Sequence, residues 1–205
     1  MSRQVMPDPL LPQRGESRGP RANTHARSEV LRMLRDDHRS VKSAFRQFDR
    51  LDVVDDAEAC ESLIRQTCHE LDIHSHLEEE VFYPAVREVL PCKTLIDDAE
   101  VEHQTMTMLL DQVRGAVMGD PRLAASFRVL GEYIKHHVKE EEGEMFRQLS
   151  HAKLDWQRLL DDMQGRRSQL MEGGDDVGSL SCQPGKAVGM PLEMRADGWR
   201  GGPHS

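Results

Sequence analysis

Four successive segments of the chain repeat apolar residues at helical spacing, and each segment interrupts its apolar stripe with a histidine. The interruptions are His38, His74, His103 and His137, in that order. A buried histidine needs partners for its ring nitrogens, so stripes of this kind must bring polar groups together inside a helical core. This pattern limits the possible folds more than any other feature of the sequence.

Two of the segments add a glutamate one turn after the histidine, with Glu78 after His74 and Glu141 after His137. Residues four apart share one face of a helix, about 5 to 6 Å apart at Cβ. The chain therefore contains two similar halves, each with a single-histidine helix followed by a helix with a His/Glu pair. An unpaired carboxylate in a helical core is costly, and a bound cation would satisfy both halves at once.

The composition also favours helices, because aromatic residues make up only 4% of the chain and charged residues 31%. Helices are expected to start near Ser28, Thr94 and Pro121, and to cover residues 55–89 and 154–171. Pro84 is expected to kink or break the second of them. We therefore expect an all-α protein, an up-down-up-down four-helix bundle with an extra C-terminal helix.

Residues 28–171 are expected to form this bundle. Residues 1–27 and 172–205 are rich in Pro, Gly, Ser and Arg without helical periodicity, and both are expected to be disordered, flexible tails. The first 27 residues carry a net charge of +3 within a total of −9, so the remainder carries −12. An acidic body argues against binding to nucleic acid, which needs a clustered basic surface.

No apolar run reaches the length of about 18 to 20 residues that crosses a bilayer, and the N-terminus lacks the apolar region of a secretory signal. We therefore expect no membrane partner and a cytoplasmic location. The four cysteines show no CxxC spacing, so we expect reduced thiols with no part in a metal site.

Each candidate ligand also has a simpler explanation. A single core histidine is more often a hydrogen-bonded structural residue, and the EEE runs at 78–80 and 140–142 are typical of solvated helix faces. The pairs His76/Glu80 and His136/Glu140 are alternative ligand pairs, although His76 and His136 lie about 200° and 100° from the apolar stripe by helical geometry. The joint occurrence on four successive helices favours metal binding, and a mixed set of imidazoles and carboxylates suits a pair of iron or manganese ions.

The segments DDHRSV, HSHLEEEVFYPAVRE, EHQTM and HHVKEEEGEMF resemble the hemerythrin-like, HHE cation-binding family over about residues 28–171. The resemblance implies a non-heme di-iron centre, oxo- or hydroxo-bridged, in a four-helix bundle, with manganese as the alternative metal. It also implies that two bridging glutamates and four histidines are the metal ligands: His38, His74, Glu78, His103, His137 and Glu141. One departure is Arg147, which stands where the family often has proline.

By this resemblance we expect a protein that binds or senses dioxygen or a related small diatomic or peroxide ligand. One alternative is a redox enzyme acting on peroxide or nitric oxide, or an iron donor in cluster repair. Repair-type relatives tend to carry an N-terminal cysteine segment, and residues 1–27 contain no cysteine. Another alternative is an iron- or oxygen-responsive regulatory module. The sequence does not decide whether the chain is an enzyme, and it identifies no protein partner.

Overall fold

The computed structural model describes residues 20–117 and 119–173. The expectation of flexible tails falls mainly on residues 1–19 and 174–205, which lie outside the described residues. The described part contains helices and no strand, so the all-α prediction is confirmed. None of these helices combines the length and the apolar character that a bilayer-spanning segment requires.

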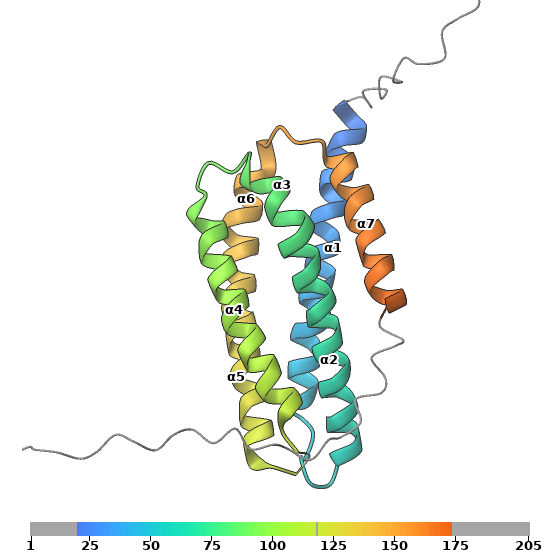
Figure 1. The fold of residues 1–205 in the computed structure, drawn as a ribbon, viewed down its shortest axis with the longest axis vertical. Coiled ribbons are helices and arrows are strands. Elements are labelled where there is room, and N and C mark those ends of the chain that lie inside the picture. Colours follow the sequence, from blue (N-terminus) through green and yellow to red (C-terminus); the bar gives the residue numbers. More distant parts are fainter. Residues whose placement is uncertain (1–19, 118, 174–205) are drawn as a thin grey trace, which may run out of the picture.

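Four long helices run alternately up and down along the bundle (Figure 1). They are α1 (Pro20–Phe48), α2 (Ala57–Leu77), α4 (Thr94–Gly115) and α5 (Pro121–Glu140). The start of α5 follows local rules, because the Asp120 side chain accepts a hydrogen bond from the Arg122 amide at 2.8 Å and caps the helix. A further helix, α7 (Trp156–Gly173), packs along α1 on the outside of the bundle (Figure 1).

The first helix begins at Pro20, so the predicted start at Ser28 is wrong. The extra turns are held by contacts with the far end of the chain. The Trp156 amide donates to Asn23 Oδ1 at 2.8 Å, Asn23 Nδ2 donates to the Leu154 carbonyl at 3.0 Å, and Ala26 is fully buried. The spacing of residues along one helix carries no information on contacts with a distant segment, so it could not predict the earlier start of α1.

Short elements continue α2 and α5. After α2 come a π-helical turn, η1 (Glu78–Phe82), and α3 (Tyr83–Arg87); after α5 come a second π-helical turn, η2 (Glu141–Met145), then α6 (Phe146–Gln148) and a 3-10 turn, η3 (Leu149–His151). In η1 the Tyr83 amide donates to the Glu78 carbonyl, and in η2 the Phe146 amide donates to the Glu141 carbonyl. Each bond spans five residues, so each turn holds one residue more than an α-helical turn.

The extra residue in η1 changes which of the later side chains face the core. Constant α-helical spacing places Val81 and Ala85 in the core, but both are only partly buried. Phe82 and Val86 are buried instead, because one added residue turns every later side chain by about 100°. Pro84 directly follows η1 and has no amide hydrogen to donate to the turn that holds Glu80. The second π-helical turn, η2, forms with Arg147 at the equivalent position, so such a turn does not require a proline.

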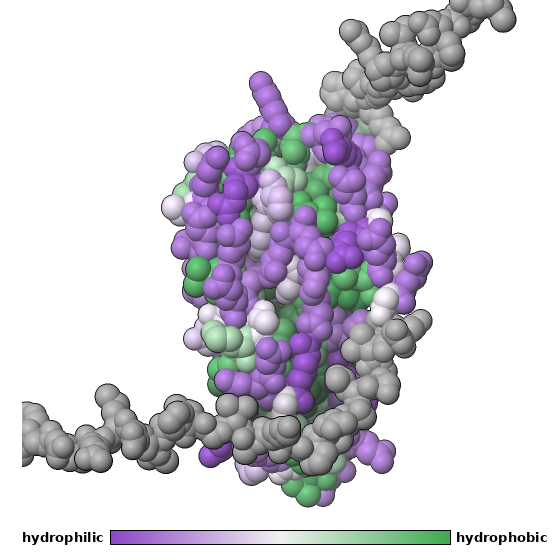
Figure 2. All heavy atoms as spheres, viewed as in Figure 1, coloured by the Kyte–Doolittle hydropathy of each residue, from purple (hydrophilic) through white to green (hydrophobic). Residues whose placement is uncertain are grey.

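The bundle interior has two apolar clusters with a polar layer between them. The upper cluster joins α7 to the ends of the other helices, with Leu34, Leu77, Phe82, Met145 and Trp156 among its members. The lower cluster fills the rest of the bundle, with Val41, Phe45, Leu71, Leu110 and Phe127 among its members. Most of the surface that Figure 2 shows is hydrophilic, with small hydrophobic patches scattered over it.

Candidate metal centre

All six predicted ligands lie in the polar layer between the two clusters, and each is at most 5% exposed. The long helices α1, α2, α4 and α5 supply one histidine each, and the π turns η1 and η2 each supply a glutamate at their first position: His38, His74, His103, His137, Glu78 and Glu141. The structure therefore brings the whole predicted set together. Its role as a ligand set stays a prediction.

Glu78 lies at the middle of the cluster. Its Oε2 atom is 3.2 Å from His74 Nε2 and 3.3 Å from His103 Nε2. It is also 3.9 Å from His137 Nε2, while Glu78 Oε1 is 3.9 Å from His38 Nε2. All four imidazoles thus point the same ring nitrogen toward one carboxylate.

The imidazoles form two facing pairs. In one half, His38 Nε2 lies 3.2 Å from His74 Nε2; in the other, His103 Nε2 lies 3.3 Å from His137 Nε2. Each pair and Glu78 can offer three ligand atoms that all lie within 4.8 Å of one another. Two neighbouring positions that share a carboxylate are the arrangement that a pair of metal ions needs.

Unpartnered oxygens inside this cluster are the strongest sign that a cation belongs there. Glu78 Oε1 and Glu141 Oε1 are buried and have no hydrogen-bond partner among the described residues, and Glu141 Oε2 has only the His38 imidazole beside it, with Nε2 at 3.2 Å. Leaving carboxylate oxygens unpaired in a protein interior is costly. Nitrogen and oxygen donors in this proportion suit iron or manganese, so the residues present fit a pair of such ions.

Each imidazole is held from behind by a second carboxylate, which the sequence analysis did not identify. The Nδ1 atoms pair with Glu142 at 2.9 Å for His38, Asp37 at 3.4 Å for His74, Glu79 at 2.8 Å for His103 and Glu102 at 2.9 Å for His137. Such a bond keeps the proton on Nδ1 and leaves Nε2 free to bind a metal. Sequence position could have identified them, because each of these carboxylates directly precedes or follows a predicted ligand.

The protein balances charge within the cluster. Burial acts to lower the pKa of His74, but the charge of Glu78 and a hydrogen bond with Asp37 raise it to about 10. Burial also acts to lower the pKa of His103, which hydrogen bonds to Glu78 and another glutamate raise to about 9. Burial and the charge of Glu78 raise the pKa of Glu141. Protons on His74 and His103 thus offset the buried carboxylates, and bound metal would replace those protons.

Tyr83 is a further residue of the site that the sequence analysis missed. Its hydroxyl donates to Glu78 Oε2 at 3.3 Å and lies 3.2 Å from His103 Nε2. Burial and the nearby glutamates hold the pKa of this phenol well above its usual range, so it stays protonated. Residues five apart do not share a face of an α-helix, and only the π turn brings Tyr83 back toward Glu78.

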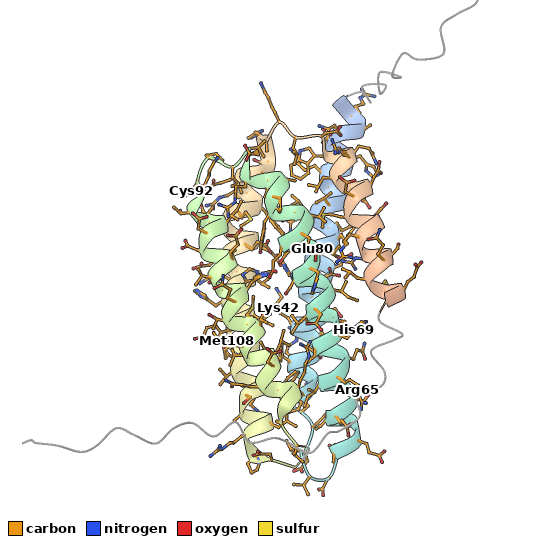
Figure 3. All side chains as sticks on the ribbon, viewed as in Figure 1. Lys42, Arg65, His69, Glu80, Cys92 and Met108 are labelled. Carbon is orange, nitrogen blue, oxygen red and sulfur yellow. The ribbon has the colours of Figure 1, made fainter. Side chains whose placement is uncertain are left out.

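The alternative ligand pairs lie outside the centre. His76 is exposed, and its Nδ1 bonds to the backbone carbonyl of Asp72 at 2.8 Å. Glu80 points away from the bundle interior (Figure 3) and accepts hydrogen bonds from Arg166 of α7 at 2.6 and 3.1 Å. His136 and its partner Glu140 are also exposed. None of these residues shares the buried polar layer.

A small pocket lies against the centre on the side of the lower cluster. Its volume is about 10 Å³, which is room for about one water-sized molecule. Three imidazoles, two further polar residues and five apolar side chains line it: His38, His74, His137, Asp37, Ser75, Val41, Leu71, Met106, Ile134 and Val138. A molecule in this pocket would touch these imidazoles and an apolar wall.

Comparison with known proteins gives the family and the fold of the chain. The model of the hemerythrin HHE cation-binding domain matches residues 29–149. The crystal structure of a hemerythrin HHE cation-binding domain-containing protein from Mycobacterium kansasii has a similar fold, with a TM-score of 0.60 and 23% identity over 70% of this chain and 87% of that one. A DNA nickase of Nostoc sp. is 28% identical over 121 residues, which are 58% of this chain and 32% of the nickase. The chain thus spans about a third of that relative's length.

Proposed function

Because the chain belongs to the hemerythrin HHE cation-binding domain family, we propose that it is a non-heme di-iron protein that binds or senses dioxygen or a related small ligand. The observation that carries the proposal is the buried layer of four imidazoles around Glu78, in which Glu78 Oε1 and Glu141 Oε1 have no hydrogen-bond partner among the described residues. His38, His74, His103 and His137 would hold the irons together with Glu78 and Glu141.

The bound iron pair would supply exchange of electrons with the small ligand. The protein's own residues do the rest. The carboxylates behind the imidazoles hold each Nε2 toward the metal, and the Tyr83 hydroxyl offers a proton donor beside Glu78. The apolar side chains of the small pocket, including Val41, Met106 and Ile134, keep bulk water away from the reacting positions.

The similarity of this chain to the nickase does not favour DNA as its substrate. The similarity covers 32% of the nickase, and the part of this chain after residue 27 carries a net charge of −12. Acidic surfaces repel the phosphate backbone. We therefore propose a small-molecule ligand and no nucleic acid.

The test is the optical spectrum of the iron-loaded, anaerobically reduced protein when air is admitted and then removed. We expect a charge-transfer band that appears with air and disappears on deoxygenation. A band that persists would replace reversible binding with oxidation, and hence favour redox turnover of peroxide or nitric oxide. Absence of any iron-dependent band would contradict the proposal.

A further inference from the structure

The two halves of the centre differ in what covers them from outside. In the first half, Asp37 lies behind His74, the histidine of the His/Glu pair; in the second half, Glu102 lies behind His137. Each of these carboxylates directly precedes the other histidine of its half, His38 or His103. The residue before the paired histidine is Ile73 in the first half but His136 in the second. The residue before the buried glutamate is Leu77 in the first half but Glu140 in the second. These two equivalent positions therefore carry apolar residues in the first half, and residues of types that can bind a metal in the second half.

Helix α7 closes the first side. Leu77 is fully buried in the apolar cluster that includes Trp156 and Met163 of α7, and Ile73 packs against the same cluster. Arg167 of α7 donates to both carboxylate oxygens of Asp37. An ion that approached from this side would meet packed side chains and a fixed positive charge.

The second side stays open and negative. Glu102, His136 and Glu140, which we name the surface triad, can offer three ligand atoms that all lie within 4.8 Å of one another. His136 Nε2 is 3.5 Å from Glu102 Oε1 and 3.4 Å from Glu140 Oε1. The side chain of His136 is 62% exposed and that of Glu140 53%, so solvent ions reach both.

A hollow connects the surface triad with the buried centre. Its volume is about 20 Å³, enough for a single ion or water, and its lining includes Glu102 and Glu140 together with the buried His137 and Glu141. Glu141 is only 2% exposed, and its Oε1 atom has no hydrogen-bond partner among the described residues, while Oε2 lies 3.2 Å from His38 Nε2. Glu102 also bonds directly to the ligand histidine, with Oε2 at 2.9 Å from His137 Nδ1.

We infer that the surface triad is a capture site, which takes a divalent first-row transition cation from solvent and passes it through the hollow to Glu141. One imidazole and two carboxylates suit such a cation, and their exposure favours rapid, weak binding. This role rests on the proposed metal centre as the destination. It adds a direction of loading, from the α4 and α5 side, because α7 blocks the equivalent side.

The inference is tested by the rate at which the metal-free full chain takes up Co²⁺, followed by the visible absorption of the bound ion in a stopped-flow instrument. The variant is His136→Ala combined with Glu140→Gln, whose side chains are exposed and outside the core. The matched control is His69→Ala combined with Glu58→Gln, which makes the same chemical changes on exposed positions of α2 (Figure 3 labels His69).

We expect loading of the variant to be slower by about tenfold or more, because local negative charge raises the encounter rate of cations by this order. The final Co²⁺ stoichiometry and spectrum should equal those of wild type, and the control should load at the wild-type rate. Equal rates in the variant and wild type, or a lower final stoichiometry in the variant, would overturn the capture role. Absence of Co²⁺ uptake by the wild-type chain would overturn both proposals. If the iron-loaded protein shows no oxygen-dependent band but the Co²⁺ loading rates differ as expected, the proposed ligand is wrong and the capture site is supported.

Discussion

Each histidine of the polar layer is held by contacts at both of its ring nitrogens. For His137, Nδ1 faces Glu102 and Nε2 faces His103 and the central Glu78. A side chain that is fixed at both ends has lost its rotamer freedom before a metal arrives, so binding costs little ordering. Removing such a ring removes a donor and also leaves an unpaired carboxylate behind.

Replacement of His74 or His137 by alanine is expected to abolish iron binding, because each change removes one of the two imidazoles of a pair. Iron per chain in the purified protein measures the effect. His69→Ala is the control, since His69 is exposed on α2 outside the polar layer. Near-stoichiometric iron in either ligand variant would count against the assignment.

The described cysteines differ in reactivity. Burial raises the pKa of the Cys68 thiol to about 11, and Cys92 is exposed in the loop before α4 (Figure 3). The thiolate is the nucleophile, so iodoacetamide at pH 8 should label Cys92 and leave Cys68 unmodified in the folded chain. Mass spectrometry of the peptides reports the result, and denaturant should expose Cys68. Rapid native labelling of Cys68 would show that the α2 core opens.

At the level of elements, the π turns and α7 shape the site. Both π turns begin at a glutamate of the centre, and each ends with an aromatic residue or methionine packed in the upper cluster. The added residue in each turn lets a helix present its glutamate to the centre and still bury the residues that follow. Helix α7 then binds the outside of η1 and α1 through Arg166 and Arg167.

Arg167→Ala is expected to weaken metal binding by about tenfold, because Asp37 loses the partner that holds it behind His74. Arg166→Ala is the matched control, since it removes a neighbouring ion pair with Glu80 that touches no ligand histidine. Equilibrium titration with Zn²⁺ measures both affinities, and Arg167→Lys should recover part of the loss. Equal affinities in the two alanine variants would remove Arg167 from the support of the site.

Alanine substitutions at two helical glycines are expected to change the stability of the fold in opposite directions. A Cβ on Gly131 of α5 would lie 2.9 Å from Cδ1 of Phe45, so Gly131→Ala should destabilise the fold by about 1 to 3 kcal/mol through overpacking. A Cβ on Gly165 of α7 meets nothing within 4 Å, so Gly165→Ala should stabilise it by about 0.5 to 1 kcal/mol. Urea unfolding measures both. A stable Gly131→Ala variant would show that Phe45 moves aside at little cost.

For the whole molecule, the polar layer divides the apolar core between the upper and lower clusters. The cost of burying Glu78 and Glu141 therefore falls in the layer to which all four long helices contribute a histidine. A cation at this level would join all four long helices. Global stability should therefore depend on metal.

Metal removal by a chelator is expected to lower Tm. A ligand that binds only the folded state at about 1,000 times its Kd adds about 4 kcal/mol, which for a chain of this size corresponds to about 10 °C. Calorimetry with and without Fe²⁺ under anaerobic conditions measures the shift. The His74→Ala variant should show no such shift, and a wild-type Tm that ignores metal would contradict the location of the site.

The helical spacing of apolar residues, with histidine and glutamate in register, predicted the all-α bundle and all six residues of the polar layer. That information is local, because residues four apart on one helix share a face whatever the rest of the chain does. What local spacing could not supply is contact across the fold. The early start of α1, the carboxylate behind each imidazole and the position of Tyr83 depend on residues that other helices or a π turn bring near.

The sequence by itself determined that His38, His74, His103 and His137 point inward, since burial of the apolar stripes carries these histidines into the core. Only the tertiary structure decided how the two halves differ. Helix α7 packs on one half and closes it with Arg167, while the equivalent face of the other half keeps His136 and Glu140 in solvent. The physical reason is that an approximate repeat in sequence gives equal ligands, but a single added helix can cover only one of two equivalent faces.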